Sequence, residues 1–373
     1  MRFPHIFRKI SAVDMYIPKY TISTSVLQNV GLVEAAREVI MNAPLVPAWE
    51  AKFRGEARLK AAHYGTALEG NDLTFNEARA VMEGRESEVV ARERDVQEVI
   101  NYRNVLDFIE GLSGKSGESG FNYTKDLLLQ LHGLVVEKIV SKEQTGQYRT
   151  SQVVLKNSVT GEIGFRPPQA VDVPFLVDEL LRWLNGEFGR KEHPVLRAGV
   201  THYVLAAVHP FIEGNGRTAR AMATLVLFNE GYDIKRFFAL EEYFDKHAEE
   251  YFGSLMQVSN QSPTLEDRNL TPWLEVFTQA LAMELTRIKE QVRELSVDIK
   301  IKERRGEQVS LSERQIKLME YLHSNGEMSM REAKGVLAMV SEDTILRDLK
   351  DLMDKEVIIK RGSTKSARYV LKK

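Results

Sequence analysis

The 373-residue sequence contains no cysteine. Disulfides, iron–sulfur clusters, Cys-ligated zinc and thiol nucleophiles are therefore excluded, and any catalytic nucleophile must be oxygen or nitrogen. The charge is nearly balanced, with 51 Lys and Arg against 53 Asp and Glu, which argues against a uniformly basic protein that coats nucleic acid. No run approaches about 18 apolar residues and the N-terminus lacks the apolar core of a signal peptide. We therefore expect a soluble, cytoplasmic protein without membrane contact.

Most of the chain carries the pattern of amphipathic helices, which indicates a mainly α-helical fold. Apolar residues recur three and four positions apart, with charged residues between them, in segments such as 124–140, 173–188 and 273–302. Residues 113–120 are rich in Gly, Ser and Lys and are typical of a surface loop between helices.

A single β-hairpin is predicted to interrupt the helices. Two strand-like runs, residues 151–155 and 164–166, are separated by a polar stretch that contains glycine, and Pro167 and Pro168 close the second run. We expect this hairpin to present an exposed edge.

The organisation of the chain is predicted to change near residue 300. The charged stretch 299–308 separates a large N-terminal body from a final segment with its own pattern. We expect three regions: an N-terminal helical region over residues 1–110, a catalytic core over 111–300 and a small C-terminal domain over 301–373.

The C-terminal segment has the pattern of a winged helix-turn-helix. Two capping boxes predict the starts of two short helices: Ser312 with Gln315, and Ser329 with Glu332. A third helix is expected from about residue 341 to 355, and two β-rich pieces follow over 357–360 and 368–371, joined by the turn-like residues 361–365. The order of three helices and a β-ribbon is typical of that fold.

The same segment differs from the rest of the chain in charge. Residues 301–373 carry 16 Lys and Arg against 12 Asp and Glu, a formal charge of +4, which leaves −6 for residues 1–300. The basic residues after Val357 have no acidic residue among them and suit a wing that contacts phosphate. The predicted recognition helix, however, interleaves Arg347 and Lys350 with three aspartates that would repel a duplex. DNA contact, protein docking and a purely structural use therefore stay open as alternatives.

The most informative stretch is HPFIEGNGRTAR, residues 209–220. It lies between two apolar helices predicted over 195–208 and 218–228, so its Gly-Asn-Gly tip leads into the second helix. The glycines allow left-handed conformations in which backbone N–H groups converge on an anion, and the helix N-terminus adds further N–H groups. Arg217 and Arg220 lie three positions apart and can grip phosphate oxygens with forked donors. These residues predict a polyphosphate cradle.

Two further residues of this stretch complete a reaction centre. Glu213 offers the hard carboxylate that Mg²⁺ prefers when it also binds substrate phosphates. His209 has an ordinary pKa near neutrality and can accept a proton from an incoming hydroxyl, so we assign it as general base. The combination predicts nucleotidyl or phosphoryl transfer.

The stretch resembles the Fic family signature, H-P-F-x-[D/E]-G-N-G-R-x-x-R, at every defined position. The resemblance implies a helical Fic-type core and transfer of AMP from ATP to a Ser, Thr or Tyr hydroxyl of a target protein. It also implies that His209 deprotonates that hydroxyl and that Glu213 binds Mg²⁺. The implied phosphate ligands are Gly214, Asn215 and Gly216 for the α-phosphate, and Arg217 and Arg220 for the β- and γ-phosphates.

Two details extend the resemblance. Phosphate-transferring relatives of the Doc type carry Lys where this sequence has Gly216, so the sequence favours nucleotidyl transfer. Residues 145–149, TGQYR, and the hairpin after them resemble the family's flap, which registers a target segment by strand addition. The implied target-docking residues are Ser151, Gln152, Val153 and Val154.

A second motif implies autoinhibition. Residues 61–71, AAHYGTALEGN, resemble the family's inhibitory helix, [S/T]-x-x-x-E-[G/N], which we place at about residues 59–71. Glu69 would pair with Arg220 and take the place of a phosphate oxygen. The sequence departs from the pattern because Gly65 stands at the Ser/Thr position, with Thr66 one residue later.

Several alternatives stay open from the sequence. The chain could be a DNA-binding regulator whose Fic core senses nucleotide, or an enzyme that uses another nucleotide donor or removes AMP. The resemblance also implies a protein target of unknown identity, self-modification and a homodimer as possible partners.

Overall fold

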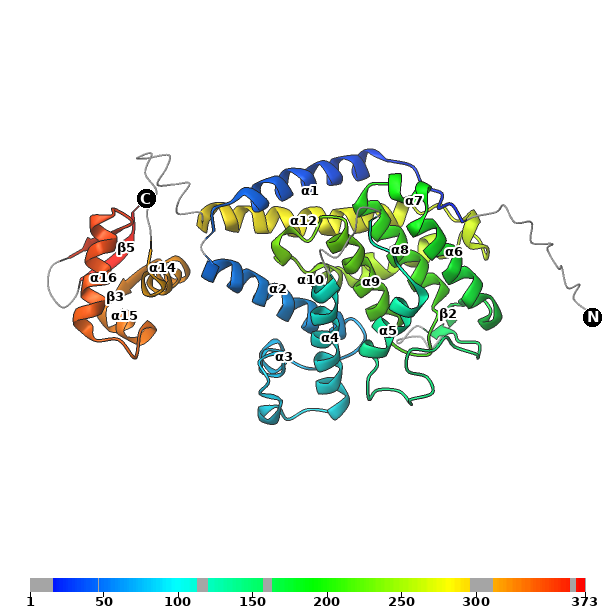
Figure 1. Cartoon of the computed structure of the whole chain (residues 1–373), viewed down its shortest axis with the longest axis horizontal. Helices are drawn as coiled ribbons and strands as arrows, with labels where there is room; N and C mark the ends of the chain where they lie inside the picture. Colours follow the sequence, from blue (N-terminus) through cyan, green and yellow to red (C-terminus); the bar gives the residue numbers. More distant parts are fainter. Residues whose placement is uncertain are drawn as a thin grey trace, which may run out of the picture. The chain divides into compact units, whose positions relative to one another are not determined.

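The computed structural model describes residues 16–45, 47–112, 120–156, 163–295, 311–362 and 367–372 (Figure 1). The chain divides into two compact units. The first comprises Met1–Arg37 and Gly55–Thr286, and the second comprises Glu38–Arg54 and Arg287–Lys373. Within the described ranges, no helix combines the length and the apolar run that crossing a bilayer requires.

The first unit is built around two buried helices, α8 (Pro194–Val208) and α9 (Asn215–Asn229), which pack side by side (Figure 1). Nearly every residue of both helices is buried, polar ones included, so neither helix has a broad solvent-exposed face. The other helices of the chain before residue 296 are α1 (Thr24–Asn42), α2 (Pro47–Ala67), α3 (Phe75–Met82), α4 (Glu93–Leu112), α5 (Lys125–Val135), α6 (Val173–Asn185), α7 (Glu187–Lys191), α10 (Leu240–Lys246), α11 (Ala248–Ser259) and α12 (Thr271–Leu295). This predominance of helices confirms the predicted mainly α fold.

Two of the predicted helices end earlier than their apolar pattern. The helix predicted over 124–140 ends at Val135, because Lys138 has a left-handed φ of 59° that a helix cannot contain. The helix predicted over 173–188 is divided by Gly186, whose extended backbone ends α6 before α7 begins. The helix predicted over 273–302 begins at Thr271 and is described as far as Leu295. Its remainder lies outside the described residues, as does the loop predicted over 113–120 except for its last residue.

The β-hairpin is present but shorter than predicted. Strand β1 (Leu155–Lys156) pairs antiparallel with β2 (Ile163–Phe165). Residues 151–154, predicted as strand, are irregular instead. The register places this segment opposite Pro167 and Pro168, which have no N–H to donate to a ladder. The segment is held in part by the Gln152 side chain, which donates to the Pro167 carbonyl at 3.0 Å.

From residue 311 onward, the described part of the second unit contains three α-helices and a three-stranded antiparallel sheet. In chain order the elements are α14 (Glu313–Asn325), β3 (Glu327–Ser329), α15 (Met330–Val336), α16 (Glu342–Asp354), β4 (Ile358–Arg361) and β5 (Arg368–Leu371), and the strand order is β3-β5-β4. Both predicted capping boxes are present. Strand β3 was not predicted, because its three residues run directly into the Ser329 cap. The winged-helix assignment stays a prediction, and the boundary predicted at 299–308 lies outside the described residues.

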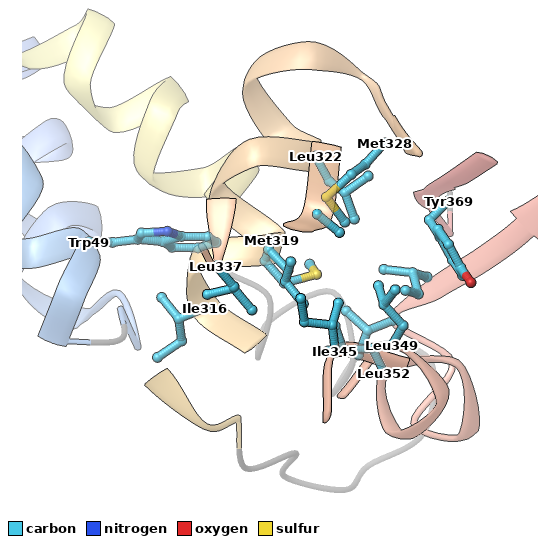
Figure 2. Packing of buried hydrophobic residues seen from close by; sticks show 14 residues of the cluster. Trp49, Ile316, Met319, Leu322, Met328, Leu337, Ile345, Leu349, Leu352 and Tyr369 are labelled. Carbon is cyan, nitrogen blue, oxygen red and sulfur yellow. The ribbon is translucent and has the colours of Figure 1, made fainter. Parts of the chain in front are cut away.

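The core of the second unit collects side chains from all three helices and from the sheet (Figure 2). Leu349 and Leu352 of α16 are fully buried there, with Leu318 and Leu322 of α14. Trp49, from the first turn of α2, belongs to the same cluster although it precedes the other members by more than 260 residues. Residues 38–54 therefore belong to this unit and supply Trp49 to its core, which the sequence pattern did not indicate.

Substitution of Leu349 by Ala is expected to destabilise the second unit selectively. The change leaves a cavity in a fully buried position and should cost about 2–5 kcal/mol. Hydrogen exchange of amides in residues 311–362, compared with residues 171–290, would measure the effect. Leu346→Ala is the matched control: Leu346 lies on the same helix but is 45% exposed, so its loss should cost within about 0.5 kcal/mol. Equal exchange in the two variants would contradict the described core.

Candidate active site

The stretch 209–220 forms the connection between α8 and α9 and the first turns of α9. His209 ends α8 with a left-handed backbone, φ 51° and ψ 61°, and Gly214 precedes α9 with φ 74°. A Cβ at Gly214 would lie 2.7 Å from Val136 and 2.9 Å from Val135, so only glycine fits this turn. Helix α9 begins at Asn215, three residues before the predicted start, which places Gly216 and Arg217 in its first turn.

The Asn215 side chain fixes the loop. Its Oδ1 accepts the Phe211 N–H at 2.8 Å and its Nδ2 donates to the Phe211 carbonyl at 2.9 Å. Phe211 in turn stacks on His132, with ring centroids 3.6 Å apart. Because both polar atoms of the Asn215 amide are engaged in this way, its backbone N–H is the group left to face an anion.

His132 contributes to the same loop, a role that the sequence did not indicate. Its Nδ1 accepts the Gly146 N–H at 3.1 Å, so its Nε2 carries the proton and donates to the Glu213 carbonyl at 3.1 Å. Burial lowers the pKa of His132 to about 4, which keeps the ring neutral in this arrangement. The ring therefore ties the segment before the hairpin to the loop.

His209 is poised as a proton acceptor. Its Nδ1 lies 3.3 Å from the Ala206 carbonyl, and because a carbonyl only accepts, Nδ1 carries the proton in this contact and Nε2 keeps its lone pair. Burial lowers the pKa of His209 to about 4. The imidazole is therefore neutral near pH 7, as a general base must be before it takes a proton.

Arg217 and Arg220 both contact a single carboxylate, that of Glu69. The Arg217 Nε donates to Glu69 Oε2 at 2.8 Å, and an Arg220 terminal nitrogen donates to Glu69 Oε1 at 2.9 Å. Both arginine side chains are almost fully buried. The predicted Glu69–Arg220 contact is thus present, together with a contact to Arg217 that was not predicted.

A chain of alternating charges extends from Arg217 toward the surface. Arg217 lies 3.3 Å from Glu98 and 3.3 Å from Glu213, and Arg94 bridges the same two carboxylates at 3.0 and 3.3 Å. Both Arg94 and Glu98 come from α4. No local motif marks these residues, since their spacing is that of any i,i+4 pair on a helix surface.

Besides its contact with Glu69, Arg220 is bound by residues that are distant from it in the chain. One terminal nitrogen donates to the Tyr251 hydroxyl at 3.4 Å, and that hydroxyl lies 3.1 Å from His202 Nε2. The other donates to the Gly65 carbonyl at 2.7 Å. Arg220 therefore has a fixed position that does not depend on Glu69 alone.

Two glycines, Gly65 and Gly216, lie where neighbouring side chains leave little or no room for a Cβ atom. A Cβ at Gly65 would lie 3.2 Å from both Tyr102 and Glu241, so Ser or Thr at this position of the inhibitory pattern would crowd these two side chains. A Cβ at Gly216 would overlap the Glu69 carboxylate. Glu69 therefore lies directly against the backbone of the first turn of α9.

Comparisons with known proteins agree with this geometry. Residues 122–227 match the model of the Fic/DOC family, so this segment of the chain is similar to Fic domains. The protein adenylyltransferase Fic of Drosophila melanogaster is 30% identical over 181 residues, and that of Drosophila yakuba is 29% identical over the same length. These matches cover 48% of this chain and 34% of each relative, so the chain spans about a third of the length of the curated relatives it matches.

Solved structures show the same fold. A Fic family protein from Desulfovibrio desulfuricans superposes with a TM-score of 0.65 at 24% identity, over 96% of this chain and 98% of that one. A fragment of Fic-1 from Caenorhabditis elegans superposes with a TM-score of 0.54 at 23% identity, over 72% of each chain. The mainly α architecture with a small hairpin is therefore that of Fic proteins.

The Glu69 contacts predict a pH-dependent contribution to stability. Burial alone would raise the pKa of Glu69, but Arg217 and Arg220 outweigh it and lower the pKa below its ordinary value. The stabilisation is therefore present above the unfolded-state pKa of about 4.3 and is lost as the pH falls through the lower folded-state value.

Glu69→Gln should consequently have a lower melting temperature than wild type at pH 7, and the difference should shrink at acidic pH. The measurement is thermal unfolding of both proteins in phosphate-free buffer from pH 7 down to about pH 3, below the unfolded-state pKa of Glu69. Glu137→Gln, which changes an exposed side chain, serves as control and should match wild type throughout. A Glu69→Gln protein as stable as wild type at pH 7 would contradict the described ion pairs.

Proposed function

We propose that the protein is an adenylyltransferase that moves AMP from ATP to a Ser, Thr or Tyr hydroxyl of a protein target. The single observation that carries this proposal is the convergence of a neutral His209 and two buried arginines on one glycine-lined loop. The name of the Drosophila relatives, protein adenylyltransferase, supports the reaction class. Gly216 leaves the backbone N–H groups of the first turn open to an anion.

The chemistry assigns each residue one task. His209 Nε2 takes the proton of the acceptor hydroxyl, whose oxygen attacks the α-phosphorus of ATP while the bond to the leaving pyrophosphate breaks. The backbone N–H groups of residues 214–216 face the phosphate, and Arg217 and Arg220 neutralise the charge of the leaving group. The acceptor becomes an AMP phosphodiester and pyrophosphate is released.

Glu213 fits the single protein carboxylate with which Mg²⁺ is commonly held beside substrate phosphates. Its side chain is about one-third exposed, and among the described residues its carboxylate oxygens contact Arg217, Arg94 and the Gly214 N–H. Within the described residues, no group of three or more His, Asp or Glu side chains could hold a metal without a nucleotide. We propose that Glu213 and the nucleotide phosphates bind the ion together, which would offset phosphate charge.

Glu69 is proposed to inhibit the enzyme. Its carboxylate engages the same Arg217 and Arg220 donors that ATP phosphates require, so the two are mutually exclusive at those donors. Its approach to the Gly216 backbone blocks the cradle from the same side. Release of Glu69 is therefore a condition for productive binding of ATP.

The hairpin is proposed to receive the target segment. Leu155 and Ile163 of the two strands are exposed apolar residues, 37% and 42% accessible, and Ile212 of the active-site loop is 39% accessible. Exposed apolar side chains beside an open strand edge suit an extended peptide. The docking segment predicted at 151–154 is irregular, so the residues that offer an edge are those of β1 and β2.

The proposal predicts the masses of three proteins after incubation with ATP and Mg²⁺. Glu69→Gly, which frees Arg217 and Arg220, should gain the mass of one or more AMP groups or should label a protein in a lysate from α-labelled ATP. Wild type should be labelled much less. The double variant Glu69→Gly with His209→Ala should lose at least about 10²-fold in rate, because the general base is absent.

Each outcome of this experiment has a distinct meaning. No labelling by Glu69→Gly of itself or of any protein would reject the adenylyltransferase proposal, and labelling in the absence of His209 would remove that residue as base.

Parallel incubations with GTP and CTP test whether the enzyme uses another nucleotide donor. Loss of AMP from a labelled target on addition of wild type would instead support AMP removal. Size-exclusion chromatography of the same samples tests the predicted homodimer.

A second candidate function, contact with DNA through residues 301–373, is favoured by the arrangement of α16. Two of the aspartates that argued against it are engaged within the unit: Asp348 accepts two bonds from Arg314, and Asp351 contacts Lys355 and Gln315. Arg347 and Lys350 of the same helix are exposed, and so are Lys360 and Arg361 of β4. These four cations have no ionic partner among the described residues.

We therefore expect the full chain to bind a labelled duplex with an affinity that falls steeply between about 50 mM and 200 mM salt. Arg347→Glu with Lys350→Glu should weaken binding and reduce the slope of log K against log salt by about 2. Lys317→Glu with Arg331→Glu, an equal change of charge at exposed positions of α14 and α15, is the control. Binding that is unaffected by the α16 changes would reject this face as the contact.

A further inference from the structure

Arg149 occupies an unusual position for a charged residue. Its side chain is 2% exposed, yet no carboxylate in the described part of the chain lies within ion-pair distance of it. Its guanidinium donates only to backbone carbonyls: to His209 at 2.8 Å, Ser151 at 3.1 Å, Pro168 at 2.5 Å and Val208 at 3.4 Å. A buried cation that is satisfied entirely by carbonyl dipoles is costly and calls for a specific explanation.

The carbonyls belong to two separate structures. Val208 and His209 form the end of α8, where the proposed general base lies, whereas Ser151 and Pro168 are the two legs that lead into and out of the hairpin. The backbone N–H of Arg149 adds a further bond to the α8 end, to the Pro210 carbonyl at 2.9 Å. One side chain therefore fastens both legs of the hairpin to the residue that bears the imidazole.

The backbone of His209 needs such a restraint. A residue with a Cβ in the left-handed region costs roughly 1–3 kcal/mol and persists only when its surroundings determine it. The His209 N–H is bound to the Leu205 carbonyl within the helix, which restrains one side of the residue. The bond from Arg149 Nε to the His209 carbonyl restrains the other side, and with it the direction in which the ring leaves the backbone.

We propose that Arg149 is a positioning residue that fixes His209 and the hairpin in one geometry, so that a hydroxyl presented on the hairpin meets the imidazole Nε2. This inference rests on the proposed adenylyl transfer and assigns to Arg149 the alignment of acceptor and base. Arg149 makes none of the described contacts to Arg217, Arg220 or Glu69, so phosphate binding is independent of it.

Arginine is required for this task because of its shape. Its planar guanidinium presents five N–H donors in a fixed fork, so it can bond to carbonyls on several sides at once. Lysine keeps the charge but concentrates its three donors on one nitrogen, which cannot reach both the α8 end and the two hairpin legs. Arg149→Lys therefore removes the alignment while it leaves the charge in place.

The test uses Arg149→Lys in the full chain on the Glu69→Gly background. Arg268→Lys is the matched control, because Arg268 is also a buried arginine that donates to carbonyls, those of Ser262 and Pro263, and to a hydroxyl, without touching the site. We expect Arg149→Lys to lower kcat for self-labelling by about 10²-fold, the loss typical of a misplacement of about 1 Å. The dissociation constant for ATP, measured by calorimetry, should change less than about twofold.

A second readout does not depend on catalysis. Hydrogen exchange should rise in Arg149→Lys jointly at residues 148–156, 163–170 and 205–211, and should stay unchanged there in Arg268→Lys. If Arg149→Lys unfolds, Arg149→Met takes its place, because it removes the charge along with the bonds and leaves no unpaired buried cation.

The outcomes separate the two proposals. A kcat equal to that of the Arg268→Lys control, or ATP affinity that falls in parallel with kcat, would overturn the alignment role. If the Glu69→Gly background binds ATP but transfers nothing, the proposed function fails. Exchange then decides about Arg149: a joint rise on both hairpin legs and at the α8 end supports its positioning role, and unchanged exchange overturns it.

Discussion

The arrangement of the active-site region in the first unit depends on two buried guanidinium groups. Arg217 and Arg220 are almost completely enclosed by helices, and positive charge in such surroundings is costly unless a nearby anion or carbonyl dipoles compensate it. In this structure Glu69 supplies that anion, with Glu98 and Glu213 around Arg217. The pair is thus a ready site for a polyanion and, at the same time, a site that must be filled by the protein when no polyanion is bound.

The rest of the site follows from the need to hold these groups in place within a helical core. The loop from His209 to Gly214 contains two left-handed residues, and it is fixed by Asn215 from within and by His132 and Arg149 from outside. None of these three side chains is proposed to bind substrate. They determine where the imidazole and the N–H groups of α9 point, which is the kind of preorganisation on which electrostatic catalysis depends.

The sequence was informative where structure is local. The helical pattern, both capping boxes and the 209–220 motif were predicted, because each depends on residues a few positions apart. The contact between Glu69 and Arg220 was predicted only through a family resemblance, since 151 residues separate the two.

What could not be predicted depends on which elements meet. Arg94 and Glu98 look like an ordinary surface pair until α4 packs against α9, and Tyr251 joins the site only because α11 lies behind Arg220. Similarly, the sequence alone predicts that Asp348 and Asp351 repel DNA, because it does not show that Arg314 and Gln315 of α14 bind these two carboxylates. The observed hairpin is shorter than the predicted one because Pro167 and Pro168 not only end the second strand but also deprive the facing segment 151–154 of N–H donors.

The contact between Glu69 and the Gly216 backbone has a consequence for how this protein can change in evolution. Any side chain at position 216 would displace the Glu69 carboxylate and would narrow the phosphate cradle in the same step. Under the proposed function, a substitution of Gly216 would therefore relieve the inhibition by Glu69 only by impairing phosphate binding as well. A substitution of Glu69 would remove the inhibitory contact and leave the catalytic loop unchanged. Under the proposed function, position 69 is therefore the one at which a single substitution could convert an inhibited enzyme into a constitutively active one.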